Sequence, residues 1–261
     1  MFDYHMHTRL SYDGTGDPEK MIQKALDLGL KEICFTEHVD FDPRPEPVKM
    51  DFDVNAYQQT YEHLDVPGIK IRRGMEFGIL RDNQEDFKKA LRRYPFDFVI
   101  GSMHFVDDFD IYEEEFWLDI SPQEAERRYF DQLLDCVRAH DDFDVLGHIT
   151  YIGKLIANPC RRPIGCTEEK DQVDEILRIL AQRGKGIEIN TSGFDRCGAY
   201  LPGVDYLRRF KELGGEIVTV GSDTHDEVRV GQYCHDACLA VADVFGYVCT
   251  FENRKPIFHK L

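Results

Sequence analysis

Seven short apolar runs, most of them separated by amphipathic segments of helical period, limit what this chain can fold into. The runs are rich in Ile, Val and Phe and lie near residues 2–6, 32–36, 70–75, 97–101, 144–148, 186–190 and 217–221. Strand, helix, strand repeated along a chain predicts parallel strands joined by right-handed crossovers. The sequence therefore predicts an α/β protein, either an open doubly wound sheet or a closed barrel.

Local signals mark where some of the helices begin. Asp17 and Ser121 each stand before a proline, an arrangement in which a helix-capping side chain precedes the first helical residue. Ser121 is also followed three residues later by Glu124, which completes a capping box. Helices are therefore expected to start just after both positions.

Side chains of the types that bind metals stand at or just after the end of nearly every predicted strand. They are His5, His7, His38, Glu76, His104, His148, Asp223 and His225. The sixth run differs and ends at Asn190. In a closed barrel, every strand ends at the same site and can contribute such a residue. In an open sheet, these residues would be concentrated at the one switch point. We therefore expect a barrel, with seven units where eight are usual.

The spacing of these residues favours a cluster of cations. His5 and His7 lie on the same side of a strand because side chains alternate with period 2, so one cation can bind both. Glu76 and Asp223 supply carboxylates, which can bridge two cations and offset their charge.

Further residues extend the ligand set. His104 and His148 add nitrogen ligands typical of zinc, manganese or iron, and Asp13, His38 and His225 fall near the same rim. A lone histidine at a strand end is usually a structural group. Six of them with matching carboxylates are better explained as ligands, because burying that many unpaired ionisable groups on one rim would be costly. The sequence thus provides ligands for two to three divalent metal ions.

Composition excludes several classes of function. The chain of 261 residues has 32 basic and 49 acidic residues and a net charge of -17, which argues against nucleic acid or an anionic membrane as a partner. Its length suits one domain spanning 1–261. Eight cysteines without a C-x-x-C pair indicate reduced thiols, and the N-terminus has no signal-peptide pattern, so we expect a cytoplasmic protein. Cys234 and Cys238 have the spacing of a helix core face.

Two charged groups lie outside the ligand set. Acidic residues crowd the segment 107–119, which is either a solvated loop or an attraction for a cationic substrate. Basic residues follow the fifth and sixth strands, namely Lys154, Arg161, Arg162 and Arg196. These lie near the rim or on the surface.

Several motifs carry a family resemblance. They are His5-Met-His7-Thr, Glu37-His38-Val-Asp40, Gly74-Met-Glu76, Gly101-Ser-Met-His104, Gly147-His148, Asn190-Thr-Ser-Gly193 and Gly221-Ser-Asp223-Thr-His225. In order and spacing, over nearly the full chain, they resemble the polymerase and histidinol phosphatase (PHP) family, in particular its stand-alone phosphatases of histidinol phosphate. The resemblance implies a distorted seven-stranded (β/α)7 TIM-like barrel with up to three metals.

The resemblance also implies how the ligands divide. The first metal would be bound by His5, His7, Glu76 and Asp223. The second would be bound by Glu76, His104 and His148, and the third by Asp13, His38 and His225. Glu76, Asp223 and His225 would be catalytic. Lys154 and Arg196 would bind the substrate by clamping the outer phosphate oxygens.

The reaction implied is hydrolysis of a small-molecule phosphate ester, L-histidinol phosphate, to L-histidinol and phosphate in histidine biosynthesis. Two neighbouring cations lower the pKa of a bridging water, which yields a hydroxide for attack on phosphorus. Acids of the 107–119 segment, or Asp40, could hold the cationic end of this substrate.

Three alternatives stay open. The substrate could be another phosphate ester, such as a nucleotide, a sugar phosphate or a phosphotyrosine. The barrel could be a metal-binding regulator without activity, although all nine ligand positions are intact. It could also hydrolyse carbon–nitrogen bonds, but such barrels usually lack the Gly101-Ser-x-His104 step.

Overall fold

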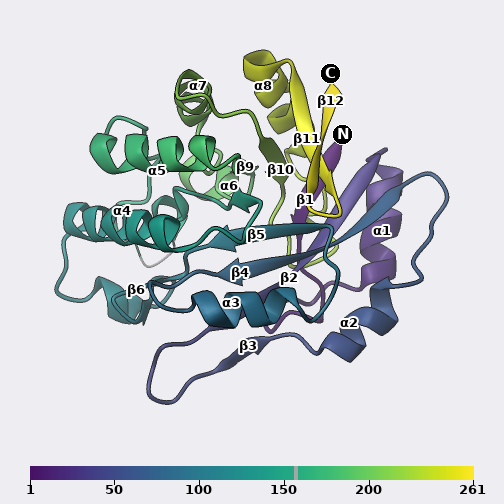
Figure 1. Cartoon of the computed structure of the whole chain (residues 1–261), viewed down its shortest axis with the longest axis horizontal. Helices are drawn as coiled ribbons and strands as arrows, with labels where there is room; N and C mark the ends of the chain where they lie inside the picture. Colours follow the sequence, from purple (N-terminus) through teal and green to yellow (C-terminus); the bar gives the residue numbers. More distant parts are fainter. Residues whose placement is uncertain (156–157) are drawn as a thin grey trace.

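Seven parallel strands form a nearly closed barrel in the computed structural model, which describes residues 1–155 and 158–261 (Figure 1). In order around the barrel they are β1 (Phe2–Met6), β2 (Glu32–Phe41), β4 (Lys70–Gly78), β5 (Phe98–Ser102), β8 (Val145–Leu146), β9 (Gly186–Asn190) and β10 (Val218–Gly221). A parallel bridge between Met6 and Thr224 brings the last strand back to the first. The predicted barrel of seven units is confirmed, and the brevity of β8 makes it uneven.

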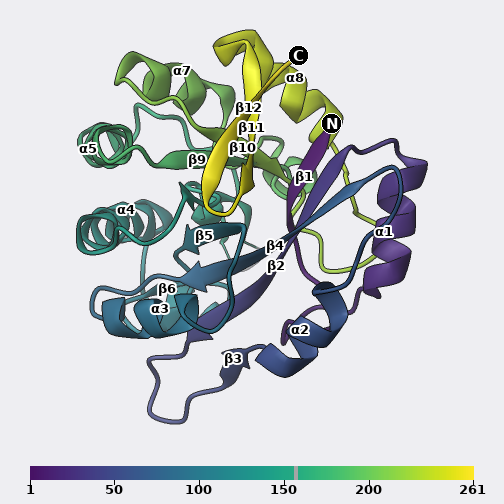
Figure 2. The ribbon, with the colours of Figure 1, turned by 45° about the vertical axis from the view of Figure 1, so that its right-hand side comes forward.

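Helices surround the strands, as Figure 2 shows. They are α1 (Pro18–Asp27), α2 (Val54–Tyr61), α3 (Gln84–Leu91), α4 (Pro122–Ala139), α5 (Lys170–Gln182), α7 (Val204–Glu212) and α8 (Cys234–Phe245). The two predicted starts are confirmed, because Asp17 accepts hydrogen bonds from the first turn of α1 and Ser121 accepts one from the Glu124 amide of α4. Cys234 and Cys238 are buried on α8. In the described ranges, no helix has the length and apolar character needed to cross a membrane.

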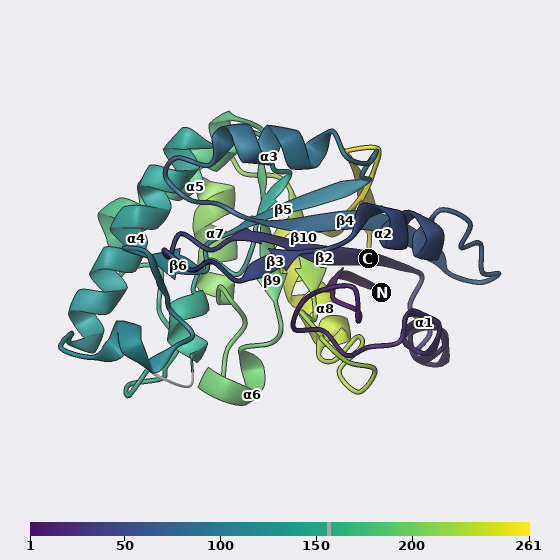
Figure 3. The same cartoon turned by 90° about the horizontal axis from the view of Figure 1, so that it is seen from below.

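Several short elements follow the strands of the barrel. β3 (Lys49–Asp51) pairs antiparallel with β2, and β6 (Phe105–Val106) pairs with β7 (Phe109–Asp110). Single turns of helix form η1 (Glu114–Trp117), η2 (Tyr151–Lys154) and α6 (Phe194–Cys197). Figure 3 shows α6 at the edge of the molecule, apart from α7.

A C-terminal hairpin covers the end of the barrel where the strands begin. It consists of β11 (Tyr247–Glu252) and β12 (Lys255–Lys260), and in Figure 2 it lies across the strands. The Tyr4 hydroxyl donates to Glu32 over 2.5 Å, and Arg72 bridges Glu32 and Glu252 over 2.7 and 2.9 Å. This network joins β1, β2 and β4 to the hairpin, where Glu252 is exposed, so the barrel opens toward the opposite end.

β1 is irregular, and two successive side chains of this strand make contacts toward opposite ends of the barrel. The pairing with β2 shifts between Asp3 and Met6, as at a β-bulge. The Tyr4 ring packs on Phe98 in the barrel floor, while His5 reaches toward the other end of the strands. The shift therefore lets β1 contribute both to the floor and to the rim.

The packing of Gly221 gives a test of the barrel. A Cβ at this position would lie 2.3 Å from the His5 Cβ and 2.6 Å from Oε1 of Glu188. We expect Gly221→Ala to lower the free energy of unfolding by about 1–3 kcal/mol through overpacking, measured by urea denaturation. Gly165→Ala is the matched control, because its Cβ would meet its nearest neighbour at 3.5 Å. Equal stability of the two variants would contradict this packing.

Candidate metal centre

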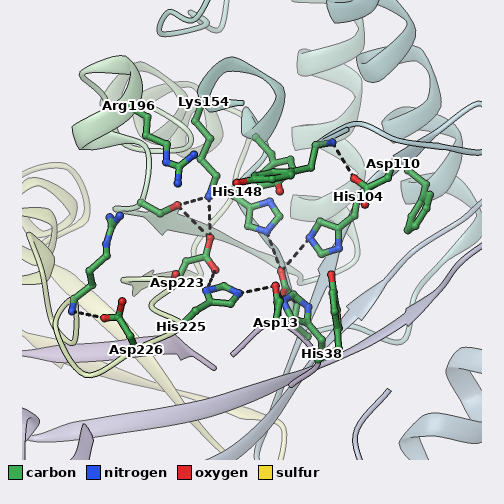
Figure 4. A pocket seen from close by; sticks show the side chains of 17 residues that line it. Asp13, His38, His104, Asp110, His148, Lys154, Arg196, Asp223, His225 and Asp226 are labelled. Carbon is green, nitrogen blue, oxygen red and sulfur yellow. Dashed lines mark hydrogen bonds and ion pairs between the residues drawn. The ribbon is translucent and has the colours of Figure 1, made fainter. Parts of the chain in front are cut away.

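The predicted site residues converge at the end of the barrel where the strands stop. A cavity of about 470 Å³ opens there, within the range of small-molecule sites. Its walls include Asp13, His38, Glu76, His104, His148, Lys154, Arg196, Asp223 and His225 (Figure 4). His5 and His7 lie beneath them, fully buried. The structure thus brings these side chains together around one cavity, and their roles as ligands and substrate contacts stay a prediction.

Glu76 lies at the centre of this group. Its Oε2 is 3.2 Å from Nε2 of His5, 3.4 Å from Nε2 of His7 and 3.0 Å from Nδ1 of His38. Its Oε1 is 2.9 Å from Nε2 of His148 and 3.6 Å from Nε2 of His104. One carboxylate therefore contacts imidazoles from both sides of the site.

The remaining candidates extend the group toward the mouth of the cavity. Oδ2 of Asp13 lies 3.1 Å from Nε2 of His225 and 3.6 Å from Nε2 of His38. Oδ1 of Asp223 lies 3.7 and 3.6 Å from the Nε2 atoms of His5 and His7.

Among the residues that the structure describes, four sets of three side chains have the spacing needed to hold a cation. In each set, one nitrogen or oxygen from every residue lies within 4.8 Å of the others. The sets are His5, His7 and Asp223; His5, Glu76 and His148; His7, His38 and His225; and His38, Asp40 and His104.

Buried polar atoms without hydrogen-bond partners support a fit to metal ions. Within residues 1–155 and 158–261, four such atoms are Nε2 of His5, Nε2 of His7, Nδ1 of His38 and Oε2 of Glu76. Such atoms are rare in folded proteins because each one costs free energy. Here they face one another, and bound divalent cations would satisfy them together.

Several histidines are oriented by a partner on their other ring nitrogen. Nδ1 of His5 donates to Glu188 over 2.6 Å, and Nδ1 of His104 donates to Asp40 over 3.0 Å. Nδ1 of His225 lies 3.1 Å from the Asp223 carbonyl oxygen. Partners of this kind leave Nε2 free to point at a metal.

The electrostatics keep the central carboxylate ionised. Burial opposes ionisation of Glu76, but the charges of His5 and His38 and hydrogen bonds from His104 and His148 outweigh it, and the pKa lies well below its usual value. The site thus holds negative charge ready for a cation.

Asp40 occupies a different position from the one that we expected for a substrate contact. Its side chain is buried against His104 and His38. Burial opposes its ionisation, yet the charge of His104 and the hydrogen bonds lower the pKa of Asp40 to about 2. Within the acidic segment, Asp110 lines the cavity, whereas Asp107, Asp108 and the neighbouring glutamates are exposed.

Two of the four basic residues lie at the cavity, and the other two lie away from it. Nζ of Lys154 donates to Oδ2 of Asp223 over 3.0 Å and to Ser192 over 2.5 Å. Arg196 reaches the same wall of the cavity from α6 (Figure 4). Arg161 is exposed, and Arg162 pairs with acids away from the site.

Glu188 is a residue of this site that the sequence analysis did not single out. It is buried in β9, where one oxygen accepts from His5 and the other accepts from the His148 amide over 2.9 Å. A signal was present, because Glu188 and Asn190 alternate with apolar residues in a predicted strand and so share the inner face.

The role of Glu188 can be tested by metal affinity. We expect Glu188→Gln to weaken zinc binding by roughly 10-fold or more, because the neutral amide no longer holds His5 in place or raises its basicity. Competition with a chromophoric chelator measures this affinity. Glu216→Gln, at an exposed position before β10, is the control. Wild-type affinity in Glu188→Gln would show that Glu188 has no such role.

Comparisons with known proteins agree with this geometry. Residues 3–192 match the sequence model of the PHP domain. The chain is 35% identical to a histidinol-phosphatase of Lactococcus lactis, over 97% of this chain and 95% of the relative. A crystal structure of the Lactococcus lactis histidinol phosphate phosphatase with zinc, L-histidinol and phosphate superposes with a TM-score of 0.89, at 33% identity and 98% coverage of both chains.

A solved structure from Listeria monocytogenes shares the fold, with a TM-score of 0.78 at 20% identity, covering 90% of this chain and 99% of that one. The match to the domain model covers most of the chain, and the Lactococcus relative is similar along almost its entire length. This chain belongs to the PHP family.

Proposed function

We propose that the protein is a histidinol-phosphatase, a single domain spanning 1–261 that hydrolyses L-histidinol phosphate to L-histidinol and phosphate. The observation that carries the proposal is the set of unpartnered ligand atoms around Glu76, in a chain similar over almost its full length to an enzyme crystallised with zinc, L-histidinol and phosphate. The proposed place of the reaction is histidine biosynthesis.

Two to three divalent cations would bind at this rim. His5, His7, Glu76 and Asp223 would hold the first, Glu76, His104 and His148 the second, and Asp13, His38 and His225 the third. Zinc suits this mixture of imidazole and carboxylate, with manganese or iron as alternatives. When bound, neighbouring cations lower the pKa of a water and neutralise phosphate oxygens.

The protein's own groups would then orient the substrate. The Arg196 guanidinium can donate two parallel hydrogen bonds to phosphate oxygens. Lys154 would hold Asp223 through its 3.0 Å contact and add positive charge to the same wall. Asp110 and Tyr12 line the cavity beyond His104 and His38, where the cationic end of histidinol phosphate would find a carboxylate and an aromatic ring.

The eight cysteines are all free thiols, which is consistent with a reducing compartment. We therefore propose that the enzyme works in the cytoplasm.

Phosphate release from L-histidinol phosphate by zinc-loaded protein tests the function. We expect a kcat/KM at least ~100-fold above those for a nucleoside monophosphate, a sugar phosphate and a phosphotyrosine peptide. A higher value for one of these esters would identify a different PHP phosphatase. No release from any ester would support a metal-binding regulator instead.

Chelation should abolish activity, because the cations supply both the nucleophile and the charge for phosphate. Metal analysis of the dialysed protein is expected to find two to three equivalents per chain. Fewer than about one equivalent, with activity intact in excess chelator, would refute the cluster.

Glu76→Gln should lose more activity than His38→Ala. Glu76 lies between two groups of imidazoles, so its neutralisation would weaken two cation sites, whereas His38 would serve the third site. Steady-state kinetics at saturating zinc compare the two variants. Similar losses, or tolerance at Glu76, would contradict the central position of this carboxylate.

Arg196→Ala should raise KM for histidinol phosphate roughly tenfold, which corresponds to about 1.4 kcal/mol of lost binding. The reason is that a guanidinium directed into the cavity would no longer contact phosphate. An unchanged KM in this variant, beside a large increase in Lys154→Ala, would assign the phosphate contact to Lys154 instead.

A further inference from the structure

We propose that Arg229 is a further phosphate-binding residue of this site and acts beside Arg196. The inference rests on the proposed phosphatase function and adds a residue that determines affinity for the phosphate group. Arg229 lies on the segment that follows Asp223 and His225, and its side chain lines the same cavity as Arg196.

The guanidinium of Arg229 has unused hydrogen-bonding capacity. Its Nε and Nη2 atoms are buried and have no hydrogen-bond partner in the described part of the chain. The nearest carboxylate, Asp195, stays 3.9 Å from Nη2. Asp195 already accepts hydrogen bonds from the Tyr233 hydroxyl over 2.6 Å and from Gln232 over 3.0 Å.

Unpaired donors of this kind are costly when buried, and a guanidinium cannot lose its charge to reduce the cost. A phosphate group offers three acceptor oxygens and negative charge, and it matches the fork of an arginine. A phosphate bound in the cavity would therefore be an acceptor for the donors that Asp195 leaves open, once the guanidinium of Arg229 turns toward it.

The backbone around Arg229 is fixed on both sides. The Arg229 amide donates to Oδ1 of Asp226 over 3.1 Å, and its carbonyl accepts from the Gln232 amide over 3.0 Å. Two residues later, the Gly231 amide donates to Asp3 of β1 over 2.8 Å. Since this segment is already anchored to the barrel, binding through Arg229 would require little additional ordering of the backbone.

The charged side chains that line the cavity leave two guanidiniums available to an anion. Five carboxylates and three basic side chains line it among the described residues. Of the basic groups, Lys154 is engaged with Asp223 at 3.0 Å. Arg196 and Arg229 remain as the guanidiniums that can turn to a bound anion.

The test compares Arg229→Gln with wild-type protein, both loaded with zinc. Titration calorimetry with inorganic phosphate measures phosphate affinity, and inhibition constants are measured for phosphate and for L-histidinol. We expect the phosphate Kd, the phosphate inhibition constant and KM for histidinol phosphate to increase together, by roughly tenfold. Inhibition by L-histidinol, which has no phosphate, should stay within twofold of wild type.

Two further variants make the result specific. Arg229→Lys should recover part of the phosphate affinity, because it restores the charge without the fork. Arg208→Gln, an exposed position on α7 outside the cavity lining, is the matched control and should leave all constants unchanged. A phosphate Kd within twofold of wild type in Arg229→Gln would overturn the proposal, as would parallel losses of phosphate and L-histidinol binding, which indicate a structural role.

The same design separates this inference from the proposed function. If wild-type protein released no phosphate from histidinol phosphate, the proposed substrate would be wrong. Calorimetry with inorganic phosphate would still decide whether Arg229 binds the anion.

Discussion

The buried carboxylate of Glu76 and the imidazoles around it form the interaction on which the site depends. Both oxygens lie within 3.6 Å of histidine nitrogens from several strands, and Oε2 has no hydrogen-bond partner in the described part of the chain. A carboxylate in such a place is stable only if positive charge accompanies it. Bound divalent cations would supply that charge and couple the stability of the rim to metal binding.

The barrel supplies this arrangement through simple geometry. Parallel strands deliver their last residues to one end, while the hairpin of β11 and β12 closes the other through Tyr4, Glu32 and Arg72. The close approach of Gly221 to His5 lets β10 return to β1. Asp223 then follows with a φ of 54°, a left-handed conformation that Asp tolerates better than most residues and that fits a side chain held for function.

Much of this was predictable from the sequence, for identifiable reasons. Short apolar runs located the strands, and ligand types at their ends indicated a ring because the strands of a barrel all end on one side of it. Other features depend on contacts that no local pattern records. Glu188 alternates with apolar residues like any strand residue, and only the fold shows that it holds His5. The pairing of Asp40 with His104, the docking of the hairpin on Tyr4 and the position of Arg229 near Asp195 likewise arise between segments distant in the sequence.

The most direct test of the central claim is the position of metal ions in a crystal of the zinc-loaded protein, located by anomalous scattering at the zinc edge. The account predicts at least two peaks at this rim, one on each side of the Glu76 carboxylate, with His5 and His7 at one and His104 and His148 at the other. A single peak that does not contact Glu76, or no peak within the ring of histidines, would contradict it.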